Sequence, residues 1–235
     1  MDRVSSSLSR LAGLLADPSR AAFCLALLDG RAWTAGELAR HVGIAPSTAS
    51  AHLTLLVDGG VLVDERQGRH RYVRLADPAV AALIEDLAAH GSASAQQASS
   101  GLREMTRAKA IARARMCYDH LAGRLGVAVC DALVGHGYLS DSGGFAFTDK
   151  GLDWLSRLDV DVAALAQAKR PFARQCLDWT ERRPHLAGSA GAALCAQAFS
   201  RGWVERIGGG RAVRVTSNGR EALAAELGLD ENQWS

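Results

Sequence analysis

The chain has 235 residues, enough for two small domains or for one domain with a large extension. Hydrophobic residues make up 48%, charged residues 22%, and the mean hydropathy is −0.01, which excludes a disordered chain, a collagen-like repeat and a membrane-spanning protein. The formal net charge is only +2. No secretory signal opens the chain, and the five widely spaced cysteines do not resemble a secreted disulfide framework. We therefore expect a cytoplasmic protein with free thiols and no membrane partner.

The first third of the chain carries local signals for a helix-turn-helix followed by a β-hairpin. Asp17-Pro18 and Asp77-Pro78 each offer an N-cap residue followed by proline at the first helical position, so a helix is predicted to start at each. Between them, residues 34–42 and 46–57 read as two helices joined by a short turn. Two short strands around Gln67-Gly68 then predict a β-hairpin.

The remainder of the chain contains an internal repeat. Residues 91–101 are small, polar and uncharged, which predicts a linker after a domain spanning residues 1–90. Within residues 102–235, His120-Leu121-Ala122-Gly123 returns as His185-Leu186-Ala187-Gly188, and neighbouring cysteine, glycine and aromatic positions match as well. Each copy reads as helix, helix, strand, glycine turn, strand, helix. The predicted fold is therefore mainly α with small β-hairpins: a winged helix-turn-helix domain for DNA binding and dimerisation, then two tandem winged-helix-like repeats that sense an effector or support the dimer.

Four segments of the first domain match one known pattern: Leu15-Ala16-Asp17-Pro18-Ser19-Arg20, Gly36-Glu37-Leu38-Ala39, Pro46-Ser47-Thr48-Ala49-Ser50-Ala51-His52-Leu53 and Gln67-Gly68-Arg69-His70-Arg71-Tyr72. On these segments, residues 8–90 resemble the ArsR/SmtB family of winged helix-turn-helix transcriptional repressors. The resemblance implies a homodimer that binds double-stranded operator DNA and is released by a small effector, often a metal ion. The duplicated part resembles the long C-terminal extension of some larger members.

The physical properties of two segments agree with DNA binding. The N-terminal end of the second helix of such a pair usually contacts bases in the major groove, and the hairpin beside it reaches phosphates or a minor groove. The predicted DNA-binding residues are Ser47, Thr48, Ser50 and His52 on the helix and Arg66, Arg69, His70 and Arg71 on the hairpin. Two other interpretations remain open: Ser47 and Thr48 as capping residues, and the hairpin as a solvated charged surface of a protein-binding module.

The metal-binding positions common in the family are absent. Residues 34–43 contain no cysteine, and Ala79 stands where a histidine ligand would follow Asp77. Sensing is therefore expected in residues 102–235 or at thiols elsewhere in the chain. The candidate effector-binding residues are Cys117, Tyr118, Asp119, His120, Cys176, Asp178, Trp179 and His185.

The chemical class of the effector stays open between a metal ion, thiol oxidation and an organic molecule. Cys117 and His120 are three residues apart, would share one face of a helix, and are weak candidates for part of a transition-metal site. In the second copy, however, an insertion, Thr180-Glu181-Arg182-Arg183-Pro184, displaces His185, so Trp179 takes the position of the histidine. Because the pair is not repeated, the sequence slightly favours an organic ligand, and no cofactor is assigned. Its pocket would be lined by Tyr118, Trp154, Trp179 and Trp203.

Three further expectations follow from the sequence. We expect a repressor, not an enzyme, because the chain shows no phosphate loop, dinucleotide fingerprint, zinc-protease helix or nucleophile elbow. The alternatives are a winged-helix adaptor for other proteins and an enzyme with a regulatory N-terminal module. The homodimer is expected to pack apolar side chains of the first and fifth helices, Leu11, Leu15, Val80, Leu83, Ile84 and Leu87. The basic residues Arg103, Arg107, Lys109, Arg113 and Arg115 are expected to form a solvated helix face, with contact to flanking DNA as the alternative.

Overall fold

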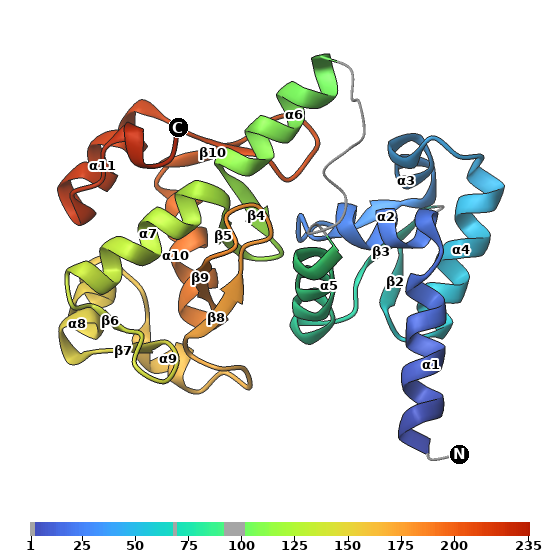
Figure 1. The fold of residues 1–235 in the computed structure, drawn as a ribbon, viewed down its shortest axis with the longest axis horizontal. Coiled ribbons are helices and arrows are strands. Elements are labelled where there is room, and N and C mark those ends of the chain that lie inside the picture. Colours follow the sequence, from blue (N-terminus) through green and yellow to red (C-terminus); the bar gives the residue numbers. More distant parts are fainter. Residues whose placement is uncertain (1–2, 68–69, 92–101) are drawn as a thin grey trace. The chain divides into compact units, whose positions relative to one another are not determined.

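The fold is taken from a computed structural model of the chain, in which residues 3–67, 70–91 and 102–235 are described (Figure 1). The chain divides into two compact units, Met1–Ile84 and Glu85–Ser235, each considered by itself below. Arg69 and the predicted linker, apart from Gly91, lie outside the described residues. Within the described part, no helix has the length and apolar character needed to span a bilayer.

The first unit has the predicted order of elements. Its helices and strands are α1 Arg3–Leu15, α2 Pro18–Leu27, β1 Trp33–Thr34, α3 Ala35–Val42, α4 Pro46–Asp58, β2 Leu62–Gln67, β3 His70–Leu75 and α5 Pro78–Gly91, of which α5 continues into the second unit. The predicted starts of α2 and α5 are confirmed: the carboxylate of Asp17 accepts hydrogen bonds from two backbone N–H groups of α2, and that of Asp77 does the same at α5. Gly43, at φ 80°, ends α3 and starts the turn into α4.

A small antiparallel sheet completes the winged helix-turn-helix. Its strand order is β1-β3-β2, and Leu62 lies opposite Leu75 at the buried end of the hairpin. Helices α2, α3 and α4 contribute buried apolar side chains, including those of Phe23, Leu38 and Leu53. From Asp64 onward the side chains of β2 are exposed, so the β2–β3 hairpin, the wing, extends beyond this core.

The second unit contains the duplication. Its elements are α6 Leu102–Arg113, β4 Arg115–Cys117, β5 His120–Ala122, α7 Gly123–Gly135, β6 Leu139–Ser140, β7 Ala146–Phe147, α8 Asp149–Arg157, α9 Val162–Ala166, β8 Arg174–Leu177, β9 Pro184–Ala187, α10 Gly188–Ser200, β10 Val204–Arg206, β11 Val213–Val215, α11 Ser217–Leu227 and a 3-10 turn Glu231–Gln233. Each repeat runs hairpin, helix, hairpin, helix: β4–β5–α7–β6–β7–α8 in the first and β8–β9–α10–β10–β11–α11 in the second. Buried side chains from both repeats, such as Leu125, Leu155 and Cys195, belong to one core.

The predicted helix at the start of each repeat is wrong, because a β-hairpin occupies that place. Gly123 and Gly188 follow these hairpins with φ of 75° and 90°, a conformation that favours glycine and that a continuous helix cannot contain. A Cβ at either position would lie 2.7 Å from backbone carbonyl oxygens, those of Ala112 and Phe172 respectively. The chain therefore turns sharply before α7 and α10 and leaves the preceding residues as strands.

Candidate nucleic-acid interface and metal-ligand cluster

The N-terminal end of α4 presents small hydroxyl side chains to solvent. Ser47, Thr48 and Ser50 are all exposed. The N-cap position is Ala45, and no side chain caps the helix start. Backbone N–H groups in the first turn of a helix have no partner within the helix, and they attract anions such as phosphate. This end of α4 therefore offers both hydroxyl and backbone donors to a nucleic acid.

His52, the fourth predicted DNA-binding residue of α4, is placed differently. Its Nδ1 lies 3.4 Å from Nη1 of Arg20 and 3.9 Å from Oδ1 of Asp17, and its ring meets Phe23 edge to face. These contacts connect α4 to the start of α2. In this structure His52 faces the neighbouring helix.

The wing carries exposed basic residues next to α4. Arg66 lies opposite Arg71 in the β2–β3 register, and the exposed His70 starts β3. Arg71 donates from Nε to Oδ2 of Asp64 at 2.7 Å and from Nη1 to Oγ1 of Thr54 at 3.3 Å. Because Thr54 is on α4, Arg71 connects the wing to the helix whose start offers the hydroxyl donors.

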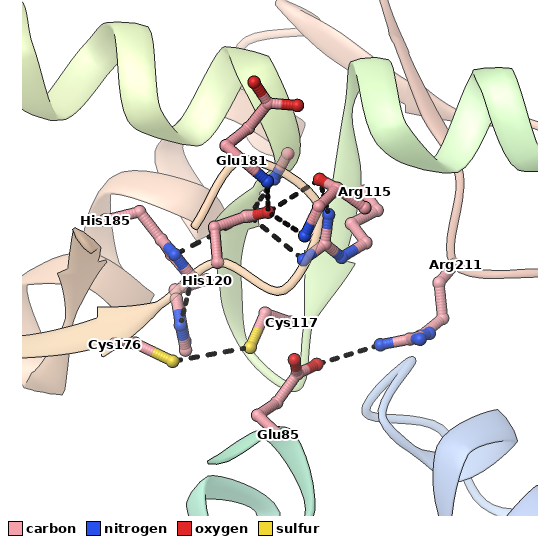
Figure 2. Close-up of polar contacts among 11 residues, drawn as sticks. Glu85, Arg115, Cys117, His120, Cys176, Glu181, His185 and Arg211 are labelled. Carbon is pink, nitrogen blue, oxygen red and sulfur yellow. Dashed lines mark hydrogen bonds and ion pairs between the residues drawn. The ribbon is translucent and has the colours of Figure 1, made fainter. Parts of the chain in front are cut away.

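In the second unit, two cysteines and two histidines from the two repeats meet in one buried cluster (Figure 2). Their ligand atoms, the Sγ atoms of Cys117 and Cys176 and one ring nitrogen each of His120 and His185, all lie within 4.8 Å of one another. We call these four residues the Cys–His cluster. Each repeat supplies one cysteine and one histidine from its first hairpin.

The hairpin register explains the meeting and corrects two expectations. Cys117 and His120 lie directly opposite each other on β4 and β5, so the predicted shared helix face is wrong. Cys176 and His185 are opposite on β8 and β9 in the same way, so the expected displacement of His185 is also wrong. The insertion lengthens the hairpin loop and leaves both strand positions unchanged. Trp179 therefore lies in the loop and does not replace the histidine.

The cluster has a regular internal geometry. The two Sγ atoms are 3.9 Å apart, the two Nε2 atoms are 3.1 Å apart, and the imidazole rings are stacked with centroids 5.0 Å apart. On the far side of the rings, Nδ1 of His120 lies 3.2 Å from Oδ1 of Asp119, and Nδ1 of His185 lies 3.7 Å from Oδ2 of Asp178. Each imidazole therefore has a carboxylate behind it and its Nε2 toward the other.

Arginines hold these two carboxylates. Nη1 of Arg170 lies 2.5 Å from Oδ2 of Asp119. Asp178 is fully buried and accepts hydrogen bonds from Arg115 at 3.0 Å and from the backbone N–H of Gly123 at 2.6 Å. Although burial acts to raise the pKa of Asp178, the charge of Arg115 brings it down to about 2. Asp178 is therefore a fixed negative charge beside His185.

Arg115 was expected on a solvated helix face, and that expectation is wrong. The residue lies on β4, is fully buried, and places its guanidinium 4.8 Å from the centre of the Trp179 ring. The expectation failed because the helix α6 ends at Arg113, two residues earlier. Of the predicted basic run, Arg115 is therefore part of the interior of the second unit, where it pairs with Asp178.

The two cysteines of the cluster differ in their ionisation. Burial, together with the hydrogen bond to Cys176, raises the pKa of the Cys117 thiol well above its usual value. The hydrogen bond from Cys117 lowers the pKa of Cys176 against the effect of burial, and His120 and His185 lower it further. For His120, burial opposes protonation, but hydrogen bonds to Asp119 and Cys176 outweigh it and raise its pKa. The pKa values of the two thiols therefore shift in opposite directions, upward for Cys117 and downward for Cys176.

A further buried carboxylate acts on the cluster from the second unit's part of α5. Glu85 is 1% exposed and accepts a hydrogen bond from Arg211 at 2.9 Å through Oε1 (Figure 2). Its Oε2 has no hydrogen-bond partner among the described residues, and its charge contributes to the raised pKa of Cys117. The burial of Glu85 cannot be predicted from the sequence, because a Glu-Asp pair on a helix is typical of an exposed position.

The other cysteines and the predicted aromatic pocket do not form a comparable site. Cys24, Cys130 and Cys195 are buried, and burial raises the pKa of each thiol to about 12. Trp154 is buried in the core and stacks on Tyr138. A cavity of about 510 Å³ in the second unit has none of the four predicted aromatic residues in its lining, which comes mainly from α7 and the C-terminal segment.

The signal for a four-residue cluster was present in the repeat itself. Cys117 matches Cys176, and His120 matches His185, although by different offsets. An insertion between two matched residues is compatible with a hairpin loop, and in a hairpin the two ends remain opposite. Interpreting the segment as a helix removed this possibility.

The fold of the first unit is that of a winged helix-turn-helix DNA-binding protein, and comparisons with known proteins agree with it. A helix-turn-helix domain family matches residues 15–65. The uncharacterized HTH-type transcriptional regulator YdfF of Bacillus subtilis is 39% identical over 227 residues, which cover 96% of this chain and 99% of that protein. The chain belongs to this family of HTH-type transcriptional regulators, within the ArsR family that the first domain resembles.

Two further proteins are similar to the N-terminal part only. The HTH-type transcriptional regulator CmtR of Mycobacterium tuberculosis is 40% identical over 82 residues, which cover 35% of this chain and 69% of CmtR. The solution structure of the homodimeric winged helix-turn-helix DNA-binding domain of Mb0332 from Mycobacterium bovis is 26% identical, with a TM-score of 0.37, and covers 43% of this chain and 95% of that domain. Of these three proteins, YdfF alone extends across the duplicated unit.

Proposed function

We propose that this transcriptional regulator is a homodimeric repressor that binds an inverted-repeat operator and is controlled by an effector in its second unit. The observation that carries DNA recognition is the combination, within one unit, of an uncapped α4 start rich in exposed hydroxyls and a wing with exposed basic residues. A helix-turn-helix dimer places its two recognition helices in successive major grooves, about one helical turn apart, so its operator is an inverted repeat.

The proposed contacts have two roles. Ser47, Thr48 and Ser50 lie where a recognition helix contacts base edges and phosphates, so they contribute to sequence preference. Arg66 and His70 on the wing contribute sequence-independent contacts to phosphates. Arg71 orients the wing, since its guanidinium is already engaged by Asp64 and Thr54. Arg69 remains a proposed contact from the sequence.

The effector site that the geometry favours is the Cys–His cluster. The slight preference for an organic molecule rests on a second copy without its histidine, whereas Cys176 and His185 lie opposite each other on β8 and β9. The cluster joins the two repeats, so a ligand bound there acts on both. Repression is proposed from the family resemblance, and binding of the effector is expected to release the protein from its operator.

A gel-shift titration tests DNA binding. The purified full chain is mixed with a random DNA pool, the bound fragments are selected and sequenced, and the dissociation constant of the best one is measured at several salt concentrations. We expect an inverted repeat among the selected sequences. Arg66→Ala should weaken binding to every sequence and reduce the slope of log K against log salt by about 0.9 for each lost phosphate contact.

The matched control is Arg214→Ala, which removes the same charge from an exposed β11 residue of the second unit. It should leave the dissociation constant and the salt slope unchanged. Equal salt slopes for wild type and Arg66→Ala would contradict the wing's role. The absence of any salt-dependent DNA binding would contradict the repressor and favour a protein-interaction adaptor.

A further inference from the structure

The Cys–His cluster has the composition and spacing of a metal site, and we propose that Cys117, His120, Cys176 and His185 together bind one divalent cation of the zinc class in a closed tetrahedral site. This inference rests on the proposed function in one respect: it identifies the effector of the proposed effector site as a metal ion. Binding of the ion is measured without DNA, so either proposal can fail alone.

The sulfur–sulfur and nitrogen–nitrogen distances within the cluster match a tetrahedral ion. Two sulfur atoms each about 2.3 Å from a tetrahedral zinc ion lie about 3.8 Å apart, and two nitrogen atoms at about 2.0–2.1 Å lie about 3.3 Å apart. The observed separations are 3.9 Å between the Sγ atoms and 3.1 Å between the Nε2 atoms. A disulfide would require the sulfur atoms to be about 2.05 Å apart. The two thiols are free in this structure, and their separation fits a shared ion.

The groups behind the histidines also have the arrangement of a metal site. A histidine that binds a metal almost always donates its other ring N–H to a carboxylate, a carbonyl or a water, and this fixes the ring. Asp119 occupies that place at Nδ1 of His120, within hydrogen-bond distance, whereas Asp178 lies 3.7 Å from Nδ1 of His185, close enough for an ion pair but not for a hydrogen bond. Both imidazoles therefore present Nε2 to the centre of the cluster. Of the two carboxylates behind the histidines, Asp119 is the more accessible, with a 31% exposed side chain.

The repeat symmetry shows that the fold holds the four residues closely. A Cβ at Gly126 in α7 would lie 3.7 Å from Cβ of His185, and a Cβ at Gly191 in α10 would lie 3.5 Å from Cβ of His120. Each histidine therefore packs against a glycine of the other repeat's helix. Two hairpins carry the four ligands, and two helices pack against the two histidines.

The donor set selects the class of ion. Two sulfur and two imidazole donors suit zinc and softer thiophilic ions, whereas magnesium and calcium require oxygen donors. All four residues are at most 4% exposed, and four protein ligands complete a tetrahedron. A closed site of this kind leaves no position for a substrate, so we assign it to binding and to joining the repeats, not to catalysis.

Ordinary packing of buried thiols explains the cluster less well. Cys24, Cys130 and Cys195 show what packing alone produces in this chain: buried thiols that are not part of any metal-ligand group found among the described residues. In the cluster, by contrast, two cysteines, two histidines and two carboxylates coincide at the junction of the repeats.

The experiment measures metal content and coordination on the full chain. Untagged protein is stripped with a chelator and titrated with cobalt(II), and the zinc-loaded form is analysed by native mass spectrometry. We expect one ion per chain, intense visible bands of tetrahedral cobalt and a sulfur-to-cobalt charge-transfer band. Failure to bind one ion per chain, or the weak spectrum of octahedral cobalt, would overturn the site without using any variant.

Two matched pairs of variants assign the ligands. Cys117→Ala should abolish stoichiometric binding, while Cys130→Ala, another buried cysteine, should keep it. Asp119→Asn should weaken zinc affinity by about 10–100-fold and retain the tetrahedral cobalt spectrum, because Asp119 is a positioning residue. Asp131→Asn, at an exposed carboxylate paired with Arg183, should change neither. Unchanged stoichiometry and affinity in both Cys117→Ala and Asp119→Asn would overturn the assignment.

Discussion

Two glycines of α7 differ in the space that surrounds them, so the same substitution by alanine is expected to have opposite effects on stability at the two positions. A Cβ at Gly126 in α7 would lie 2.5 Å from the carbonyl oxygen of Leu121, which is backbone and cannot rotate away. At Gly135, at the end of α7, nothing lies within 4 Å of a Cβ. Gly126→Ala should therefore destabilise the protein by about 1–3 kcal/mol, as overpacking does.

The matched substitution Gly135→Ala should be neutral or should stabilise the protein by up to about 1 kcal/mol, because alanine costs less conformational entropy in a helix. Urea denaturation followed by circular dichroism compares the midpoints. If Gly126→Ala unfolded at the same urea concentration as Gly135→Ala, the close approach of the β5 backbone to α7 would be wrong.

At the residue scale, the sequence identified the chemistry of the site but not its arrangement. All four residues of the Cys–His cluster were candidates, yet a spacing of three between Cys117 and His120 fits a helix face and a two-residue hairpin turn equally well. Tyr118 adopts φ 59° in that turn, and neither turn residue is a glycine or an asparagine, the residues that usually indicate such a conformation. The burial of Arg115 was equally hidden, since its partner Asp178 lies 63 positions away in the chain.

The start of α3 shows how a capping interaction gives an element its pH dependence. Thr34 accepts a hydrogen bond from the N–H of Glu37, and the carboxylate of Glu37 accepts one from the N–H of Thr34 at 2.7 Å. The backbone hydrogen bond from Thr34, and then its hydroxyl, lower the pKa of Glu37. A lowered folded-state pKa means that this stabilisation is present above the unfolded value of 4.5 and is lost as pH falls through the folded value.

Glu37→Gln keeps a capping side chain but removes the charge. The variant should melt below wild type at pH 7, and the difference in Tm should shrink towards zero as the solution is acidified below pH 4.5. Glu65→Gln, at an exposed residue of β2, serves as the control for general charge effects. A Tm difference for Glu37→Gln that is the same at neutral and acid pH would show that the carboxylate's charge does not support the cap.

At the element scale, sequence prediction succeeded where structure is determined locally. Asp17-Pro18, Thr34 and Asp77-Pro78 fixed the starts of helices in the first unit because capping involves residues two or three positions apart. The first hairpin of each repeat is determined by contacts between distant segments. For example, the N–H of Met116 in β4 donates to the carbonyl of Arg211 at 2.8 Å, and such a partner cannot be read from local periodicity.

For the whole molecule, the duplication gives the second unit a site that neither copy could form alone. One repeat supplies only two soft or borderline ligands, whereas a closed zinc-class site needs four. The two copies meet so that their hairpins contribute equivalent residues, and the longer loop of the second hairpin does not disturb the match. The repeat can be recognised in the sequence, but the contact between its two copies is seen only in the folded structure.

At the scale of the whole molecule, the apolar side chains of α1 predict where the proposed dimer forms. Val4 and Leu8 of α1 are 71% and 67% exposed, and with Leu11 and Leu15 they form one apolar stripe at helical spacing. If this stripe is an interface between two copies, Leu8→Glu buries an unpaired charge and should raise the dimer dissociation constant by at least about 100-fold. Ile207→Glu, which places the same charge at a 43% exposed residue of the second unit, should leave the dimer intact. Sedimentation equilibrium gives the dissociation constant, and gel shift gives the accompanying loss of operator affinity, since each monomer then holds a single half-site. A Leu8→Glu protein that remains dimeric at the wild-type concentration would assign the dimer to another surface.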